Sequence, residues 1–329
     1  MAATAEAASA KVAAASLIAP TFATLTRVFG AGGVLPESVA AAAGGDRRYL
    51  GFCQRALRPD VTDAARQRQT LRDTWVSMPA PICRALPADV LDQQHALLAA
   101  ELAESTVVEA VTLPTVAPQV AIWQGDMAHL RCDAVVNPGN AQLLGCFAPS
   151  HRCLDNILHA QAGPRLRVAC LDMMERLGID QDGNGNCRVT DAFSLPAGKV
   201  YHTVGPCLLD PYQPHRPARP PTAVDRAELK SCYVRCYQTA MSEGAKSLAF
   251  CCISTGIFGY PAEEAAALAL TTIKEQQDFI RAAGKAGPLV VFNVFKDEDL
   301  AIYTRLAPTV FVTPAVAAEG AAEVDGESA

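Results

Sequence analysis

Apolar residues in the last two thirds of the chain follow two alternating patterns. Short, mainly apolar runs bounded by turn-forming residues are typical of buried strands, and they occur at 107–116, 119–124, 133–136, 199–204, 247–253 and 288–295. Apolar residues at helical spacing predict helices at 154–162, 164–177, 227–241, 262–283 and 296–306. Because strands alternate with helices, the pattern predicts an α/β fold, arranged as a three-layer α/β/α sandwich on a mixed sheet.

The first 105 residues have a different pattern. Residues 1–45 contain sixteen alanines and only four charged side chains, which predicts a weakly ordered or partly helical extension. A transit peptide is the alternative, but such peptides are rich in Arg and Ser, and this segment holds a single arginine. At 46–105, charged and apolar residues alternate at helical spacing between prolines. This segment is expected to form several short helices that act as a packing appendage.

The other atypical segment is the C-terminus. Residues 308–329 contain Glu and Asp but neither Lys nor Arg, and this composition predicts a disordered acidic tail.

Composition narrows the expected partners and compartment. Half of the 329 residues are hydrophobic and the formal net charge is −6, so nothing attracts nucleic acid phosphates in general, and no nucleic acid partner is expected. Twelve cysteines without a secretory signal suggest reduced thiols and a cytoplasmic protein. No apolar run approaches the roughly 20 residues that span a membrane. We expect a monomer that does not contact membranes.

The most informative stretch follows the apolar run at 133–136. The sequence Asn-Pro-Gly-Asn at 137–140 can only form a turn, and α/β folds bind ligands where strands reach their carboxyl ends. Shortly afterwards come Cys146, His151 and Cys153, in the spacing Cys-x4-His-x-Cys. The stretch therefore places a candidate metal site beside a candidate ligand loop.

Two thiols and an imidazole suit zinc, and three protein ligands leave the open position that a catalytic zinc site requires. Two alternatives stay open at this point. Without a metal, Cys146 and Cys153 would be buried apolar residues and His151 a surface residue. With a fourth ligand, such as His159 on the following helix, the site would be closed and structural.

Four motifs give the chain a family resemblance. They are Gly-Asp-Met at 125–127, Val-Val-Asn-x-x-Asn at 135–140, His-Thr-Val-Gly-Pro at 202–206 and Ser-Thr-Gly-Ile-Phe-Gly-Tyr-Pro at 254–261. In this order they resemble the successive ligand loops of a macrodomain. The insertion Gly-Cys-Phe-x-Pro-x-His-x-Cys-x-Asp-Asn at 145–156 resembles the signature of the zinc-dependent macrodomain family, whose known members hydrolyse ADP-ribose from modified proteins. The resemblance implies a macrodomain at 106–307 with about six strands, preceded by a helical segment.

The resemblance also implies roles for individual residues. Asp126 would bind the adenine amino group and Asn140 the distal ribose. The loop at 254–260 would hold the diphosphate, because small residues ahead of a helix present several backbone N–H groups at one point. For Phe295, both stacking on adenine and burial in the core are open. The expected ADP-ribose ligands are Asp126, Met127, Asn137, Asn140, Ser254, Thr255, Gly256, Ile257, Phe258, Gly259, Tyr260 and Phe295, and the expected catalytic set is Asn140, Cys146, His151 and Cys153.

These features predict a zinc-dependent hydrolase that removes mono-ADP-ribose from protein side chains. Its partners would be ADP-ribose and mono-ADP-ribosylated proteins, and zinc would either activate water or position the distal ribose. The chain departs from the family pattern at Pro138 and Gly139, where macrodomains often have Ala-Ala, and at Ser150, but neither change removes a ligand. A non-catalytic ADP-ribose reader with a structural zinc is the alternative. A third possibility is an interaction protein that works through its N-terminal helices.

Overall fold

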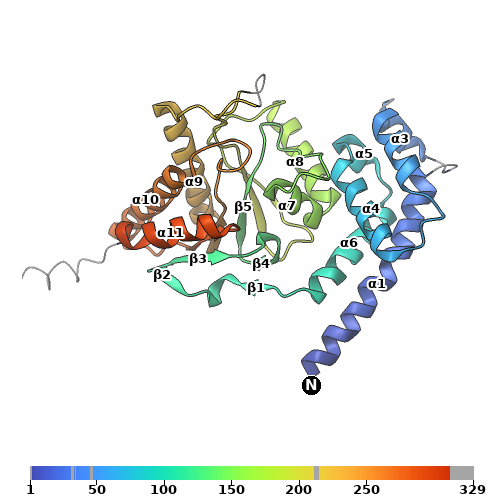
Figure 1. Ribbon diagram of the computed structural model, residues 1–329, viewed down its shortest axis with the longest axis horizontal. Helices are drawn as coiled ribbons and strands as arrows, with labels where there is room; N and C mark the ends of the chain where they lie inside the picture. The colour runs from blue at the N-terminus through green and yellow to red at the C-terminus, as the bar shows by residue number, and fades with distance from the viewer. Residues whose placement is uncertain (1, 31–32, 34, 45–46, 211–214, 312–329) are drawn as a thin grey trace, which may run out of the picture.

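A central sheet lies between two layers of helices, and a separate helical unit packs at one side (Figure 1). The computed structural model describes residues 2–30, 33, 35–44, 47–210 and 215–311. The predicted three-layer α/β/α sandwich is confirmed.

Among the described residues, seven strands form the central sheet. In spatial order they are β2 (Thr115–Ala117), β3 (Val120–Gln124), β9 (Leu289–Val294), β8 (Ser247–Phe250), β5 (Ala134–Pro138), β7 (Lys199–Thr203) and β6 (Arg188–Asp191). The five inner strands are parallel, and the edge strands β2 and β6 are antiparallel to their neighbours. β5 and β8 are buried along almost their whole length, as expected for parallel strands that are covered by helices on both faces.

The carboxyl ends of the inner strands meet at one edge of the sheet. The register pairs Gln124 with Val294, Phe250 with Phe292 and Pro138 with Thr203. The segments that follow these strands therefore lie side by side, and they include the predicted ligand loops.

The helices of the two layers match the five predicted helices, with ends shifted by a few residues in two of them. α7 (Leu154–Ala162) and α8 (Pro164–Leu177) cover one face, and α9 (Ala223–Glu243), α10 (Ala262–Ala282) and α11 (Asp297–Val310) cover the other (Figure 1). Gly178 ends α8 in the left-handed conformation, which costs glycine little. Thr222 and Asp225 form a capping box at the start of α9.

The N-terminal helices form a unit with its own core. They are α1 (Ala2–Phe29), α2 (Glu37–Ala43), α3 (Arg47–Ala56), α4 (Ala64–Ser77), α5 (Ala80–Ala85) and α6 (Ala88–Glu104). Their shared core includes Phe22, Leu25, Leu71, Trp75 and Leu97. The unit packs on the sandwich through contacts of α4 with α7 and of α5 with α8.

The segment 1–45, expected to be weakly ordered or partly helical, contains the long helix α1. Phe22, Leu25 and Phe29 are buried on one side of this helix, and α1 packs along α6 and α4. The many alanines favour the helical conformation, while these spaced large apolar residues give the helix a face to bury.

The C-terminal end of the last helix differs from the sequence-based expectation. α11 continues through Pro308 to Val310 instead of ending before the proline, with Tyr303 and Ala307 buried on its inner side. The rest of the predicted acidic tail, 312–329, lies outside the described residues.

The strand predicted at 107–116 is also wrong. It is divided into β1 (Val108–Glu109), a 3₁₀ turn at Ala110–Thr112 and β2, and β1 pairs separately with β4 (Leu130–Arg131).

Among the described helices, none combines the length and apolar character needed to cross a bilayer.

Candidate active site

A small set of hydrogen bonds fixes the conformation of the loop after β5. The Gly139 N–H donates to the Thr203 carbonyl oxygen at 2.9 Å. Asn140 bridges the loop: its Nδ2 donates to the Gly145 carbonyl oxygen at 3.1 Å, and its Oδ1 accepts from the Gln142 N–H at 3.1 Å. Gly145, with φ of +89°, then turns the chain toward the predicted metal ligands.

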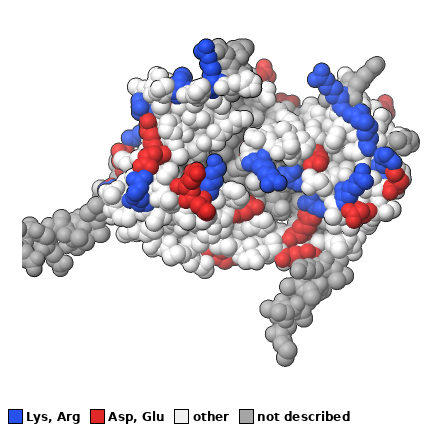
Figure 2. Space-filling model, in the orientation of Figure 1, with Lys and Arg blue, Asp and Glu red and all other residues white. Residues whose placement is uncertain are grey.

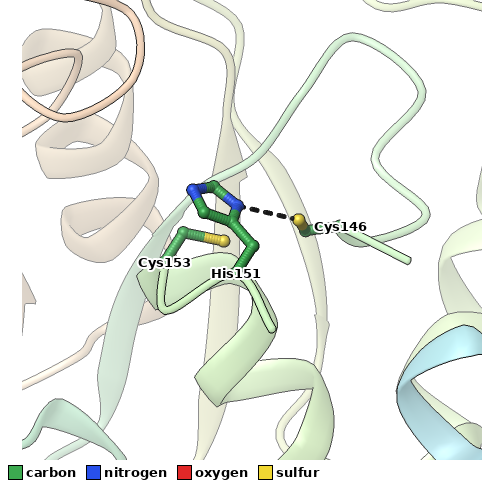
Figure 3. Close-up of side chains that lie close together, drawn as sticks. All are labelled: Cys146, His151 and Cys153. Carbon is green, nitrogen blue, oxygen red and sulfur yellow. Dashed lines mark hydrogen bonds between the residues drawn. The ribbon is translucent and has the colours of Figure 1, made fainter. Parts of the chain in front are cut away.

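The structure brings the three predicted metal ligands together. Their Sγ and ring nitrogen atoms all lie within 4.8 Å of one another, and Cys146 Sγ is 3.1 Å from His151 Nδ1. Figure 3 shows the three side chains converging from the loop and from the start of α7. All three are half-buried, so one side of the set faces the solvent region.

Asn156 fixes the loop that carries these ligands. It is fully buried, and its Nδ2 donates to the carbonyl oxygens of Ala148 at 2.8 Å and His151 at 2.9 Å. Burial, and to a lesser degree the nearby Cys146, raises the pKa of Cys153 to about 12. A divalent cation reverses this effect, because the thiolate is the form that binds metals. The donor set and its spacing therefore fit zinc.

His159 does not complete this set. Its ring nitrogens gather with Cys170 Sγ and the ring nitrogens of His202 in a second, fully buried group. The possibility of a closed four-ligand site through His159 is therefore not supported by the geometry.

Asn137 is fully buried in a network beneath the loop. Its Nδ2 donates to Asp155 Oδ1 at 2.8 Å and lies 3.2 Å from His202 Nδ1, and His202 Nε2 lies 2.9 Å from the Thr190 hydroxyl. Burial raises the pKa of Asp155 to about 6 and lowers that of His202 to about 4. The network connects β5, β6 and β7 to α7, so Asn137 supports the loop from below.

A cavity of about 590 Å³ runs along the carboxyl ends of the parallel strands. This volume is within the range of small-molecule sites. Its wall includes the predicted residues Asp126, Met127, His151, Cys153, Ser254, Thr255, Gly256, Ile257, Phe258 and Phe295. The sequence motifs therefore meet in one site, as predicted from their positions after parallel strands.

The end of the cavity at β3 and β9 suits a flat, amino-bearing group. Asp126 Oδ1 accepts from the Ala128 N–H at 2.9 Å, and Oδ2 lies 3.3 Å from His129 Nδ1. The Phe295 side chain is 72% exposed at the cavity wall. Burial of Phe295 in the core is thereby excluded, and its ring is free to stack.

The loop after β8 presents unpaired donors to the cavity. Ser254 has φ of +65°, and the Tyr260 N–H closes the loop on the Ser254 carbonyl oxygen at 3.0 Å. Within the described structure, the N–H groups of residues 256–258 donate to no protein acceptor. Such a group of free N–H donors suits an anionic group such as a diphosphate.

Four of the predicted ligand residues do not line the cavity. They are Asn137, Asn140, Gly259 and Tyr260. Asn140 is turned into its own loop, Gly259 takes a left-handed turn with φ of +73°, and Tyr260 is buried with its hydroxyl toward Glu264. In this structure these side chains make contacts within the two loops or beneath them, and their assignment as ADP-ribose ligands stays a prediction.

Sequence reasoning missed two arginines that join the helical unit to the metal-ligand loop. Arg72 of α4 lines the cavity, and its Nη1 donates to the Pro149 carbonyl oxygen at 3.2 Å. Arg167 of α8 is buried and donates to four carbonyl oxygens, those of Leu144, Trp75, Val76 and Met78. Local sequence patterns identify neither residue, because the partners lie far away in the sequence. Pro149 is 77 positions from Arg72, and Trp75, near the end of α4, is 92 positions from Arg167.

Comparison with known proteins agrees with this architecture. Residues 136–269 match the family model of the Macro domain. A protein-ADP-ribose hydrolase of Treponema medium is 38% identical over 185 residues, which cover 56% of this chain and 66% of that protein. A protein-ADP-ribose hydrolase of Staphylococcus aureus is 36% identical over 190 residues, which cover 58% of this chain and 66% of that protein.

The chain thus spans just under two thirds of the length of these two relatives. Among solved structures, the Trypanosoma brucei macrodomain in complex with ADP-ribose is similar, with 26% sequence identity and a TM-score of 0.50. That alignment covers 72% of this chain and 94% of the other.

Proposed function

This chain contains a domain of the Macro domain family, and on that basis we propose that it hydrolyses mono-ADP-ribose from modified protein side chains, with one zinc ion at Cys146, His151 and Cys153. One observation carries the proposal. Two of these three residues, His151 and Cys153, belong to the wall of the same cavity that holds Asp126 and the loop after β8. The names of the two hydrolase relatives support the same activity.

ADP-ribose can be placed in this cavity by its chemistry. Asp126 would accept a hydrogen bond from the adenine amino group, and Phe295 would stack on the ring. The N–H groups of residues 256–258 would hold the diphosphate. β3 and β5 are three strands apart in the sheet, about 14 Å at the usual spacing. The distal ribose would then reach Gly139 and the metal ligands.

The residues around the metal ligands prepare that end of the cavity for bond cleavage. A zinc ion held by Cys146, His151 and Cys153 would supply a Lewis acid at this end of the cavity. Asn156 and Asn140 fix the loop on which the ligands stand, so that a ribose held at Gly139 keeps one orientation. Leu154 and Ile157 contribute apolar surface to the same wall and limit the access of bulk water.

The reader alternative accounts less well for this arrangement. A binding module needs shape and donors for ADP-ribose, but it has no use for three metal ligands that open on the cavity. A zinc site that only stabilised the loop would be expected to have four protein ligands, and the described residues place three in this set.

The decisive experiment combines metal analysis with a release assay. Wild-type protein with full zinc should release ADP-ribose from aspartate-, glutamate- or serine-linked substrates. His151→Ala should bind free ADP-ribose within about tenfold of wild type, or ~1.4 kcal/mol, yet release almost none, because a transition-state contact contributes little to ground-state binding. Asn140→Ala should lower the release rate by loosening the loop.

Two results would contradict this proposal. A zinc-loaded wild-type protein that binds ADP-ribose but releases none from any of the three linkages would favour the reader. Unimpaired release by folded, zinc-free His151→Ala would keep the hydrolase and discard the metal. Circular dichroism must first show that each variant is folded, since metal loss can loosen a loop.

A further inference from the structure

Two arginines from different parts of the chain line the cavity beside the metal ligands. Arg72 comes from α4 in the N-terminal helical unit, and Arg152 lies between His151 and Cys153. α4 is outside residues 136–269, which match the Macro domain. The helical unit therefore adds a cationic group to the site that the matched part of the domain does not supply.

These two side chains have donors to spare. Arg72 donates from Nη1 to the Pro149 carbonyl oxygen. Its ion pair with Asp73 is long, with 3.7 Å between Nη1 and Oδ1. Arg152 is exposed and forms no ion pair with any described residue. By contrast, Arg84 and Arg165, on the neighbouring surface, are each paired with carboxylates. A free guanidinium presents a planar fork of donors that fits a carboxylate.

The rest of the cavity already accounts for the charges of ADP-ribose. The diphosphate is served by the N–H groups of 256–258, and Arg72 lies instead with the Pro149 carbonyl and the loop of metal ligands. On the proposed function, the modified protein must enter at that end, because its side chain carries the bond to be broken. Lys and Arg side chains lie around the hollow in the middle of this face, with Asp and Glu side chains beside them on one side (Figure 2); the acidic residues of the cavity wall are Asp126 and Asp299.

We propose that Arg72, with Arg152, recognises acidic residues that flank the modified side chain of the substrate protein. This inference rests on the proposed hydrolase function and names a substrate class for it. The chain as a whole carries a net charge of −6 and would repel an acidic partner. Arg152, which has no ion pair among the described residues, and Arg72, whose ion pair with Asp73 spans 3.7 Å, offset that repulsion where the partner must dock, and they would steer it into the site.

The test compares two peptides that carry mono-ADP-ribose on the same central residue. One has Glu or Asp at the two positions on each side, and the other has Ser or Gly there. Wild-type protein should release ADP-ribose from the acidic peptide with a kcat/KM about three- to tenfold higher. The difference should lie mainly in KM and should shrink as salt rises from about 0.05 to 0.5 M, because the charges are partly exposed.

Variants at position 72 make the test specific to charge. Arg72→Gln should reduce the ratio of the two kcat/KM values toward one, and Arg72→Lys should keep most of it. Arg72→Glu should reverse the preference when the acidic peptide is compared with one flanked by Lys. Arg66→Gln is the matched control, because Arg66 lies on the same helix, is exposed and does not line the cavity.

The outcomes separate this inference from the proposed function. Equal kcat/KM for both peptides in wild type, or an unchanged ratio in Arg72→Gln, overturns the inference and leaves the hydrolase standing. A parallel loss on both peptides with weaker binding of free ADP-ribose assigns Arg72 to the diphosphate and also overturns it. If neither peptide is cleaved, the hydrolase fails. The affinities of the two peptides for wild type and Arg72→Gln, measured by fluorescence anisotropy, still decide the charge preference.

Discussion

The guanidinium carbon of Arg167 lies 4.6 Å from the centre of the Phe147 ring. The same side chain donates to the Leu144 carbonyl oxygen at 2.8 Å and to the end of α4, with Nη2 bonded to the Val76 carbonyl oxygen at 3.0 Å. One buried cation therefore ties the loop of metal ligands to the N-terminal helical unit. Its guanidinium cannot be replaced by a neutral group without donors unless buried carbonyl oxygens are left unpaired.

Arg167→Met should lower the free energy of unfolding by about 3 kcal/mol or more. The methionine keeps the stem but supplies no donors, and each unpaired buried acceptor costs about 1–3 kcal/mol before the structure relaxes. Urea denaturation measures the change. Arg176→Met, at an exposed position of the same helix, should stay within about 0.5 kcal/mol of wild type. Equal effects of the two substitutions would show that Arg167 does not hold the two units together.

Asp126→Ala should weaken binding of free ADP-ribose by about 1.5–3 kcal/mol, the range for a hydrogen bond to a charged group, and should leave zinc in place. Because Asp126 also accepts from the Ala128 N–H, Asp126→Asn is the better-matched variant, since its amide oxygen keeps that bond. Isothermal titration calorimetry on both variants gives the affinities. Wild-type affinity in Asp126→Ala would remove Asp126 from the adenine site.

The purified protein should contain about one zinc per chain. The double substitution Cys146→Ala, Cys153→Ala should remove it, because two of three ligands are lost. Cys207→Ala should leave it unchanged, since Cys207 is exposed and outside the metal-ligand groups. Inductively coupled plasma mass spectrometry provides the count. Unchanged zinc in the double variant would place the metal elsewhere.

His202 should make the fold sensitive to acid. Burial lowers its pKa from 6.5 to about 4 in the folded state, so the unfolded chain takes up a proton at a higher pH than the folded one. The stability contribution is complete above pH 6.5 and is lost as pH falls toward 4, by up to about 1.4 kcal/mol per pH unit. The buried His159 has the same sign. Asp155, with a pKa raised to about 6, has the opposite sign and offsets part of the loss.

The measurement is urea denaturation at pH 7, 6 and 5 with a chelator present, so that metal loss does not contribute. His202→Gln, which has no titrating ring, should show a shallower decline between pH 6.5 and 5 than wild type. An identical slope in the two proteins would mean that His202 titrates normally in the folded state.

The sequence determined which loops share the site, but not how their side chains are directed. Asp126, Gly139 and Ser254 each follow a parallel strand, and parallel strands end at one edge, so their proximity could be predicted. The proximity of Cys146, His151 and Cys153 could also be predicted, because residues within one short loop must lie close together. Asn137 and Asn140 lie off the cavity wall, because the position of Asn137 on β5 directs it into the core and a local turn holds Asn140.

Contacts between distant segments could not be predicted from local patterns. Arg72 reaches Pro149 across 77 positions, and Arg167 reaches Trp75 across 92. In the sequence, both look like ordinary arginines on the polar face of a helix. The packing of α1 was missed for a related reason: its alanines gave no clear period, and the few large apolar residues acquire meaning only when α4 and α6 are placed beside them.

The buried cation at Arg167 limits how this protein could have been assembled or dissected. A helical unit exchanged for another by recombination would have to present carbonyl oxygens at the same places as Trp75, Val76 and Met78, or leave a guanidinium without partners in the interior. Removing residues 1–105 does the same. A shortened protein without activity would therefore say nothing about whether the helices bind a partner. Both units are expected to be inherited as one piece, and point variants at their junction are the informative ones.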